Sequence, residues 1–187
     1  LKFHNRSNRI RNLSLTSYVE WVLGPSRPAS VAFVKTEIDS ETGAMFAQNP
    51  WSTAFGSRVA FADMNGHQDD WTGDRREFIG RNGTLASPEA LADSSPFSKM
   101  TGAGFDPCSA MKTTIRILPN ESVEIAFFFG QAANAADARN LIARYRAADL
   151  DAIQLEVSRY WEDVLGAVQV KTPDRSMDIM LNGWLLY

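Results

Sequence analysis

The polar side chains best suited to binding a substrate lie together at residues 71–83, in the sequence WTGDRREFIGRNG. This segment contains three arginines and two carboxylates, namely Asp74, Arg75, Arg76, Glu77 and Arg81. An arginine guanidinium offers several N–H donors in one plane, so it suits sugar hydroxyls, carboxylates or phosphate. The glycines of the segment allow tight turns or a close approach of the backbone to a ligand. The same residues are also typical of an internal ion-pair network that holds a long loop, and their spacing does not separate the two interpretations.

A second segment, NPWSTAFGSR at residues 49–58, combines aromatic and polar side chains. The indole of Trp51 is suited to stacking on a sugar ring, because the axial C–H face of the sugar is apolar. A tryptophan in a turn can equally anchor a core or an interface. Trp51 is therefore a candidate for sugar binding, with a structural role as the alternative.

The remaining reactive side chains show no catalytic arrangement. His4, His67 and Cys108 are not spaced as metal ligands. Cys108 has no nearby histidine, which favours a buried structural thiol over a nucleophile. The sequence contains neither a phosphate-binding P-loop nor a G-x-S-x-G nucleophile motif. Glycoside cleavage needs an acid whose pKa is tuned in a cleft, and nothing selects one among the carboxylates near the polar segment, which are Asp63, Asp69, Asp70, Asp74 and Glu77.

Composition limits the class of protein. Hydrophobic residues make up 44% of the 187 residues, which is enough for a full core, and the net charge of −3 provides no surface for nucleic acid. The single cysteine excludes a disulfide framework and permits a reducing compartment. No apolar run approaches the roughly 20 residues needed to span a bilayer, so we expect no direct membrane contact. The missing initiator methionine and the abrupt WLLY ending lead us to expect a piece of a longer protein.

Hydrophobic patterning predicts β-structure in the first two thirds of the chain. The expected strands cover residues 11–23, 31–38, 44–47, 58–64, 109–118 and 122–129. The last two are predicted to form a hairpin through the turn at residues 119–121. The nearly apolar run VEIAFFF predicts a strand at the centre of a sheet, covered on both faces. Residues 65–105 lack periodicity, which predicts a long and therefore functional loop.

Helical spacing begins after Gly130. Helices are predicted over residues 137–147 and 149–166, the second capped by Asp149, and a third opens at residue 172. The third helix is still apolar where the chain stops, so we expect its packing partner to lie outside this sequence. Strands followed by helices predict an antiparallel β-sandwich at residues 1–132 and linker helices at residues 133–187.

Several segments are more specific than their composition, and they occur in a fixed order. They are LSLTSYVEWVLG at residues 13–24, NPWSTAF at 49–55, RVAF at 58–61, TGDRREFIGRNG at 72–83, GFDPC at 104–108 and KTPDRSMDIMLNGWLLY at 171–187. This set closely resembles the N-terminal part of the phosphorylase module of cellobiose and chitobiose phosphorylases, formerly glycosyltransferase family 36. The resemblance is strongest to the C-terminal region of cyclic β-1,2-glucan synthases, and it covers essentially the whole chain.

The resemblance implies a galactose-mutarotase-like β-sandwich, a supersandwich, whose linker helices lead into an (α/α)6 barrel. In this family, an aspartate of the barrel is the general acid, and inorganic phosphate attacks the anomeric carbon with inversion. Phosphate is thus a co-substrate, and no metal or organic cofactor is implied. Because the barrel is absent from this sequence, we expect no catalysis from this chain alone.

The resemblance also implies partners and roles. A β-linked glucan or gluco-oligosaccharide is the expected ligand, and the TGDRREF loop is expected to reach the sugar subsites of the barrel, in its own chain or across a homodimer. Arg75 or Arg76 would bind an acceptor sugar, and Asp74 and Glu77 would orient these arginines. The expected location is cytoplasmic, with an inner-membrane parent protein. The alternatives are a stand-alone carbohydrate-binding β-sandwich module and a purely structural oligomerisation domain.

Overall fold

The computed structural model describes residues 1–92 and 95–183. The chain divides into two compact units, Leu1–Ala143 and Arg144–Tyr187. The strands that the structure describes all lie in the first unit, which also holds the candidate site residues. The second unit is helical in the part that the structure describes.

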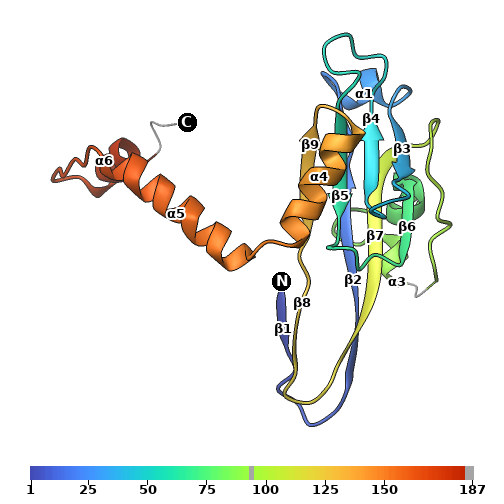
Figure 1. Cartoon of the computed structure of the whole chain (residues 1–187), viewed down its shortest axis with the longest axis horizontal. Coiled ribbons are helices and arrows are strands. Elements are labelled where there is room, and N and C mark those ends of the chain that lie inside the picture. The colour runs from blue at the N-terminus through green and yellow to red at the C-terminus, as the bar shows by residue number, and fades with distance from the viewer. Residues whose placement is uncertain (93–94, 184–187) are drawn as a thin grey trace. The chain divides into compact units, whose positions relative to one another are not determined.

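The first unit is built on two antiparallel sheets (Figure 1). In the three-stranded sheet the order is β2 (Arg11–Glu20), β7 (Pro107–Ile117), β6 (Asp70–Asp74). In the four-stranded sheet the order is β3 (Lys35–Ile38), β4 (Met45–Gln48), β5 (Val59–Asp63), β9 (Phe128–Ala132). A separate ribbon pairs β1 (Lys2–His4) with β8 (Ser122–Glu124). The predicted antiparallel β-sandwich is confirmed.

The main core lies between the two sheets. Strands β4 and β5 contribute Met45, Ala47, Ala60 and Ala62 to it, and the opposite sheet contributes Met111, Ile115 and Ile117, with Trp21 beside them. Alternate residues of β4 and β5, namely Phe46, Val59 and Phe61, point to the other face of their sheet and are also buried. Successive side chains of a strand point to opposite faces, so these two strands must be covered on both sides.

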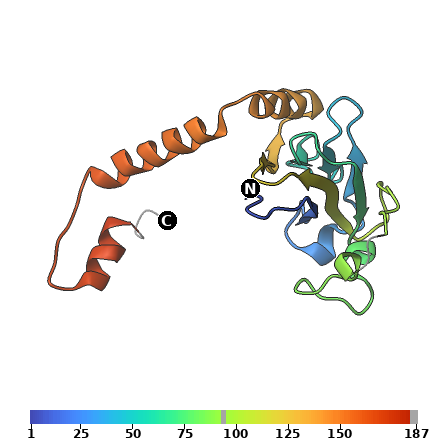
Figure 2. The ribbon, with the colours of Figure 1, turned by 90° about the horizontal axis from the view of Figure 1, so that it is seen from below.

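Short helices cover the two outer faces (Figure 2). Helix α4 (Ala135–Arg146) packs Ala138 and Ile142 against the outer face of the four-stranded sheet. Helix α2 (Arg75–Ile79) covers the three-stranded sheet with Phe78 and Ile79, and α3 (Glu89–Ala92) lies beside α2. The first unit is therefore a layered structure, with helices outside both sheets.

Helix α4 belongs to the sandwich rather than to the following helices. Arg139 forms ion pairs with Asp39 at 2.7 Å and with Glu41 at 2.9 Å, which attach the helix to the turn between β3 and β4. The compact unit accordingly runs through Ala143, whereas the sequence placed the end of the sandwich at residue 132. Helical spacing identified the helix, but it carries no information about the sheet face on which the helix packs.

The Asp39 carboxylate makes the attachment of α4 sensitive to pH. Its side chain is only 2% exposed. Burial alone would raise the pKa of Asp39, but hydrogen bonds from Arg139 and Thr42 outweigh it and lower the pKa below the ordinary 3.8. A lowered pKa in the folded state stabilises the protein above pH 3.8, and this stabilisation is lost as the pH falls through the folded-state value. We expect the free energy of unfolding, measured in urea, to decrease as the pH is lowered below about 4.

Asp39→Asn is the control for this prediction, because asparagine keeps the shape of the side chain but does not titrate. The variant should lose less stability than the natural chain over the same acid range. An identical decline in both proteins would show that other carboxylates cause the acid sensitivity.

Three sequence predictions about elements are wrong. Residues 31–34 are not extended: α1 (Arg27–Ser30) precedes them and strand β3 begins only at Lys35. The stretch 65–105 is not a structureless loop, because it contains β6, α2 and α3. The expected hairpin does not form, since β7 pairs with β2 and β6 while β8 pairs with β1. The turn at residues 119–121 is present, with the Glu121 amide donating to the Leu118 carbonyl at 3.1 Å.

The apolar run VEIAFFF also behaves differently from its prediction. It is divided between the end of β8 and the start of β9, and β9 lies at the edge of its sheet. Phe129 is consequently 67% exposed. Hydrophobicity indicated a strand in this run, but the neighbours of each strand are chosen by contacts between residues far apart in the chain.

The second unit contains α5 (Leu150–Gly166) and α6 (Arg175–Asn182). Asp149 caps α5 as predicted, accepting a hydrogen bond from the Ala152 amide at 3.0 Å. The apolar stripe of α5 is exposed, with Val157, Tyr160 and Trp161 each at least 45% accessible. The predicted continuation of the third helix through residues 184–187 lies outside the described residues.

Candidate functional site

The polar segment predicted as a binding loop forms the end of β6 and the helix α2. Asp74 is the N-cap of α2, and one of its carboxylate oxygens accepts a hydrogen bond from the Arg76 amide at 3.0 Å. Glu77 accepts hydrogen bonds from the Ser98 amide and hydroxyl, each at 2.6 Å, and from the Thr72 hydroxyl. Both oxygens of Glu77 thus tie α2 to neighbouring backbone and hydroxyls. Glu77 does not orient an arginine, contrary to the expectation from sequence.

Gly80 ends α2 for a conformational reason. Its φ of +83° is a backbone conformation that side chains rarely adopt. A Cβ at this position would also lie 2.1 Å from the Glu89 carboxylate. This glycine of the polar segment therefore permits α2 and α3 to lie close together, rather than a ligand to approach the backbone.

Arg75 points inward and belongs to an ion-pair network. Its Nε donates to Glu20 Oε1 at 2.8 Å, and Arg27 Nη1 donates to Glu20 Oε2 at 2.6 Å. Asp106 pairs with both arginines, closely with Arg27 and at 3.7 Å with Arg75. The Tyr18 hydroxyl completes the network by donating to Glu20 Oε1 at 2.7 Å. This network joins α1, α2 and the end of β2, as the structural interpretation of the polar segment expects.

The protonation of the network is fixed by these contacts. Burial alone would raise the pKa of Glu20, but hydrogen bonds from Arg75 and Tyr18 outweigh it and lower the pKa below 4.5. Burial, together with donation to Glu20, raises the pKa of Tyr18. Glu20 is therefore ionised and Tyr18 neutral near pH 7. Burial likewise raises the pKa of the Cys108 thiol, which agrees with its prediction as a structural cysteine.

Arg76 and Arg81 are the donors of the polar segment that face solvent. The Arg76 side chain is 68% exposed, and its Nε lies 3.4 Å from the Asp74 carboxylate, a long contact of little energetic value at a surface. Arg81 is exposed just after α2, and its guanidinium has no partner within the described residues. The five predicted residues thus divide into the structural Arg75 and Glu77, the capping Asp74, and two exposed arginines.

Sequence reasoning missed the acidic partners of Arg75. Glu20 lies 55 positions before Arg75, at the end of a strand, and Asp106 lies in the segment 104–108, outside the polar segment. A single carboxylate ending a strand without other charges is a weak signal, because the sequence does not show which strand end meets which helix.

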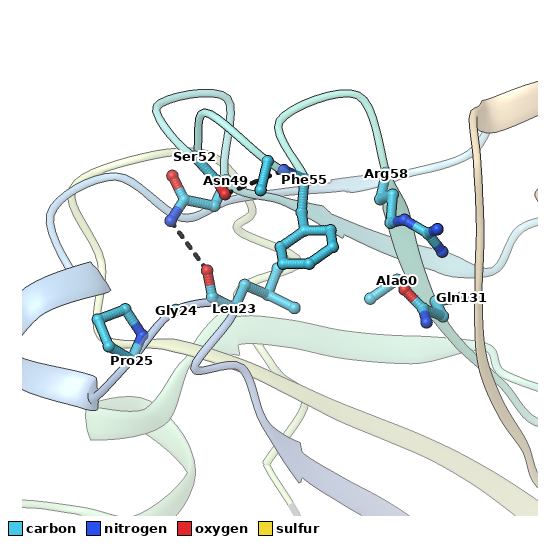
Figure 3. Close-up of a pocket in the computed structure, with 10 residues that line it drawn as sticks. Leu23, Gly24, Pro25, Asn49, Ser52, Phe55, Arg58, Ala60 and Gln131 are labelled. Atoms are coloured by element: carbon cyan, nitrogen blue, oxygen red, sulfur yellow. Dashed lines mark hydrogen bonds between the residues drawn. The ribbon is translucent and has the colours of Figure 1, made fainter.

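The second predicted segment forms one wall of a pocket of about 510 Å³ (Figure 3). Its lining comes from residues 23–25, from the loop 49–58 and from β5 and β9, and includes Leu23, Pro25, Asn49, Phe55, Arg58 and Gln131. The amide of buried Asn49 donates to the Leu23 carbonyl at 2.9 Å, which joins the two sides of the pocket. This pocket was not predicted from the sequence.

Trp51 stands on the same loop but does not line the pocket. Its side chain is 75% exposed, and its ring lies 5.5 Å from that of Phe33 in a tilted arrangement. Among residues 1–92 and 95–183, the structure records no contact that brings Trp51 to the exposed arginines of the polar segment. The two candidate regions are therefore separate surfaces of the first unit.

The described residues contain no cluster of three or more histidine, cysteine, aspartate or glutamate side chains arranged to hold a metal ion. Within the same part of the chain, none of the helices combines the length and the apolar character required to cross a bilayer.

Comparison with known families identifies the class to which this layered sandwich belongs. Residues 1–148 match the family model of the glycosyl hydrolase 94 supersandwich domain. The chain therefore belongs to this family, and the supersandwich fold expected from the resemblance is confirmed. The match includes α4, in agreement with the packing of this helix on the sheet.

Individual relatives come from two kinds of sugar-processing protein. The chain is 34% identical, over all of its 187 residues, to cyclic beta-(1,2)-glucan synthase NdvB of Rhizobium meliloti (strain 1021), and this match covers 7% of that protein. It is 21% identical to N,N'-diacetylchitobiose phosphorylase of Vibrio furnissii, over its whole length and 24% of that enzyme. The chain thus spans at most about a quarter of these relatives.

Proposed function

We propose that this chain is a non-catalytic N-terminal domain of an inverting β-glucan phosphorylase or glycosyltransferase. In this proposal, the sandwich supports a catalytic (α/α)6 barrel, and its linker helices lead into that barrel. Inorganic phosphate is the co-substrate of the longer protein, which needs no metal or organic cofactor and works in the cytoplasm. The family match and the relatives support this proposal, because in those relatives the matching region is part of a much longer chain.

We further propose that α2 contributes a side chain to sugar binding. The observation that carries this step is the contrast between two neighbouring arginines. Arg75 is held by Glu20, whereas Arg76 is 68% exposed on a helix that is itself held in place by Glu77 and by the Arg75 network. Because the helix is already ordered, only the side chain of Arg76 has to be ordered when it binds a ligand, and no loop has to be. Arg76, with Arg81 beyond the end of the helix, is therefore the donor offered to an acceptor sugar.

Arg76→Ala in the longer protein tests this role. Losing a hydrogen bond from a charged donor costs about 1.5–3 kcal/mol, so kcat/KM for the acceptor should fall roughly 10- to 150-fold. The melting temperature should stay close to that of the natural protein, because Arg76 makes only a long contact with Asp74. Steady-state kinetics with glucose 1-phosphate and a gluco-oligosaccharide acceptor measure the effect.

Arg75→Ala is the matched control, since it removes a neighbouring arginine that faces the opposite way. It should lower the melting temperature. Unchanged kinetics in Arg76→Ala together with a lower melting temperature would place Arg76 in the structural network instead. Unchanged kinetics with an unchanged melting temperature would remove the proposed sugar contact.

A further inference from the structure

The pocket between residues 23–25 and the loop 49–58 is chemically distinct from the surface of α2. Its volume of about 510 Å³ is typical of a small-ligand site. Leu23, Pro25 and Phe55 provide apolar surface, and Arg58 and Gln131 lie together at one end (Figure 3). An apolar wall with a few polar groups grouped at one end is the usual composition of a ligand pocket.

The walls of the pocket are held in place before any ligand binds. Asn49 is buried, donates to the Leu23 carbonyl and accepts from the Trp51 amide at 3.2 Å. The Phe55 amide donates to the Ser52 hydroxyl at 3.2 Å. A Cβ on Gly56 would lie only 2.7 Å from the Ser52 carbonyl oxygen, so the loop is too closely folded to accept a side chain there. A preformed pocket avoids the entropic cost of ordering a loop on binding.

The polar groups at one end of the pocket are free to bind a ligand. Within the described residues, neither the Arg58 guanidinium nor the Gln131 amide has a hydrogen-bond partner. The Arg58 guanidinium lies 5.7 Å from the centroid of the Phe55 ring, and this ring is 61% exposed. Together these side chains offer an aromatic face beside one planar set of N–H donors and one amide.

This combination fits a sugar ring better than an anion. A pyranose has an apolar C–H face that matches the Phe55 ring, and hydroxyls at its edge that match the donors of Arg58 and the amide of Gln131. Arg58 is the single charged residue in the pocket lining. A phosphate or carboxylate ligand would favour several cations and backbone N–H groups.

We propose that this pocket binds one glucose unit of a neutral β-linked gluco-oligosaccharide, with its ring on Phe55 and its hydroxyls at Arg58 and Gln131. The proposal takes its ligand class from the proposed function but not its location, since none of the polar residues of α2 lines the pocket. The pocket would hold a glucan chain on the sandwich through residues that lie outside the polar segment.

The test is a titration of this 187-residue chain with a linear β-1,2-gluco-oligosaccharide and, in parallel, a cello-oligosaccharide, followed by calorimetry. We expect weak, saturable binding of at least one of the two sugars. Phe55→Ala removes the aromatic surface under the sugar ring and Arg58→Ala removes a charged donor, so each should weaken binding at least about tenfold. Both side chains are exposed, so the melting temperature should change little.

Arg76→Ala is the variant that separates this proposal from the function proposed for α2. Binding that survives Arg76→Ala but not Phe55→Ala supports the pocket. Binding lost only in Arg76→Ala would overturn the pocket and leave the role of α2 standing. If neither sugar binds, or if inorganic phosphate binds more tightly than the sugars, the proposal is also overturned.

Discussion

A chain that stops after residue 132 should fail to fold stably, whereas a chain that stops after residue 148 should fold. The shorter chain lacks α4, which covers Phe46, Val59 and Phe61 on the outer face of the four-stranded sheet. Full burial of each such side chain contributes about 1.5–3 kcal/mol, and a whole domain is stable by only about 5–15 kcal/mol. Removing α4 also leaves Asp39 without its ion pair to Arg139. Circular dichroism melting and size-exclusion chromatography measure the outcome.

A point variant in the longer fragment tests the same packing without deleting residues. Ile142 is 1% exposed and faces the sheet, so Ile142→Ala should cost about 2–5 kcal/mol. Asn140→Ala, on the exposed side of the same helix, should change stability by less than about 0.5 kcal/mol. A soluble, cooperatively melting fragment of residues 1–132 would contradict the assignment of α4 to the sandwich.

The second large effect is expected at Glu20. Glu20→Ala leaves Arg27 and Arg75 without the carboxylate that both contact, and it removes the acceptor of the Tyr18 hydroxyl. The Glu20 side chain is 29% exposed, so solvent screens part of the loss. We expect a decrease of about 2–3 kcal/mol in the free energy of unfolding, measured in urea. In the longer protein, the same variant should also reduce acceptor use, because the support of α2 is weakened.

Glu124→Ala provides the comparison for Glu20→Ala. Glu124 pairs with Lys2 at 3.6 Å, and both side chains are about half exposed. Exposed pairs of this kind contribute no more than about 1 kcal/mol. If Glu20→Ala were no more damaging than Glu124→Ala, the network around Arg75 would be a surface feature without a structural role.

The polar segment shows what residue types and spacing can predict about a binding region. They correctly marked residues 71–83 as a region of clustered charge, but they treated its arginines as equivalent. Arg75 and Arg76 are adjacent in sequence, and their separate roles depend on Glu20 and Asp106, which the fold brings to one side of α2. Contacts between residues so far apart in the sequence cannot be predicted from local spacing, because they depend on how the strands pair.

Local sequence patterns alone were enough to predict many of the strands, one helix start and the family of this protein. Alternation of apolar residues indicated most of the strands, an aspartate before an apolar stripe located the start of α5, and ordered segments identified the family. These features depend on a few consecutive residues or on similarity to known chains, so the sequence contains them directly.

Only the tertiary structure decided which strands pair, that α4 covers a sheet, which arginine of α2 faces solvent, and that the loop 49–58 closes a pocket with β9. Each of these depends on contacts between segments distant in sequence. Such contacts are selected by burial of complementary faces and pairing of buried charges, and both are properties of the folded chain as a whole.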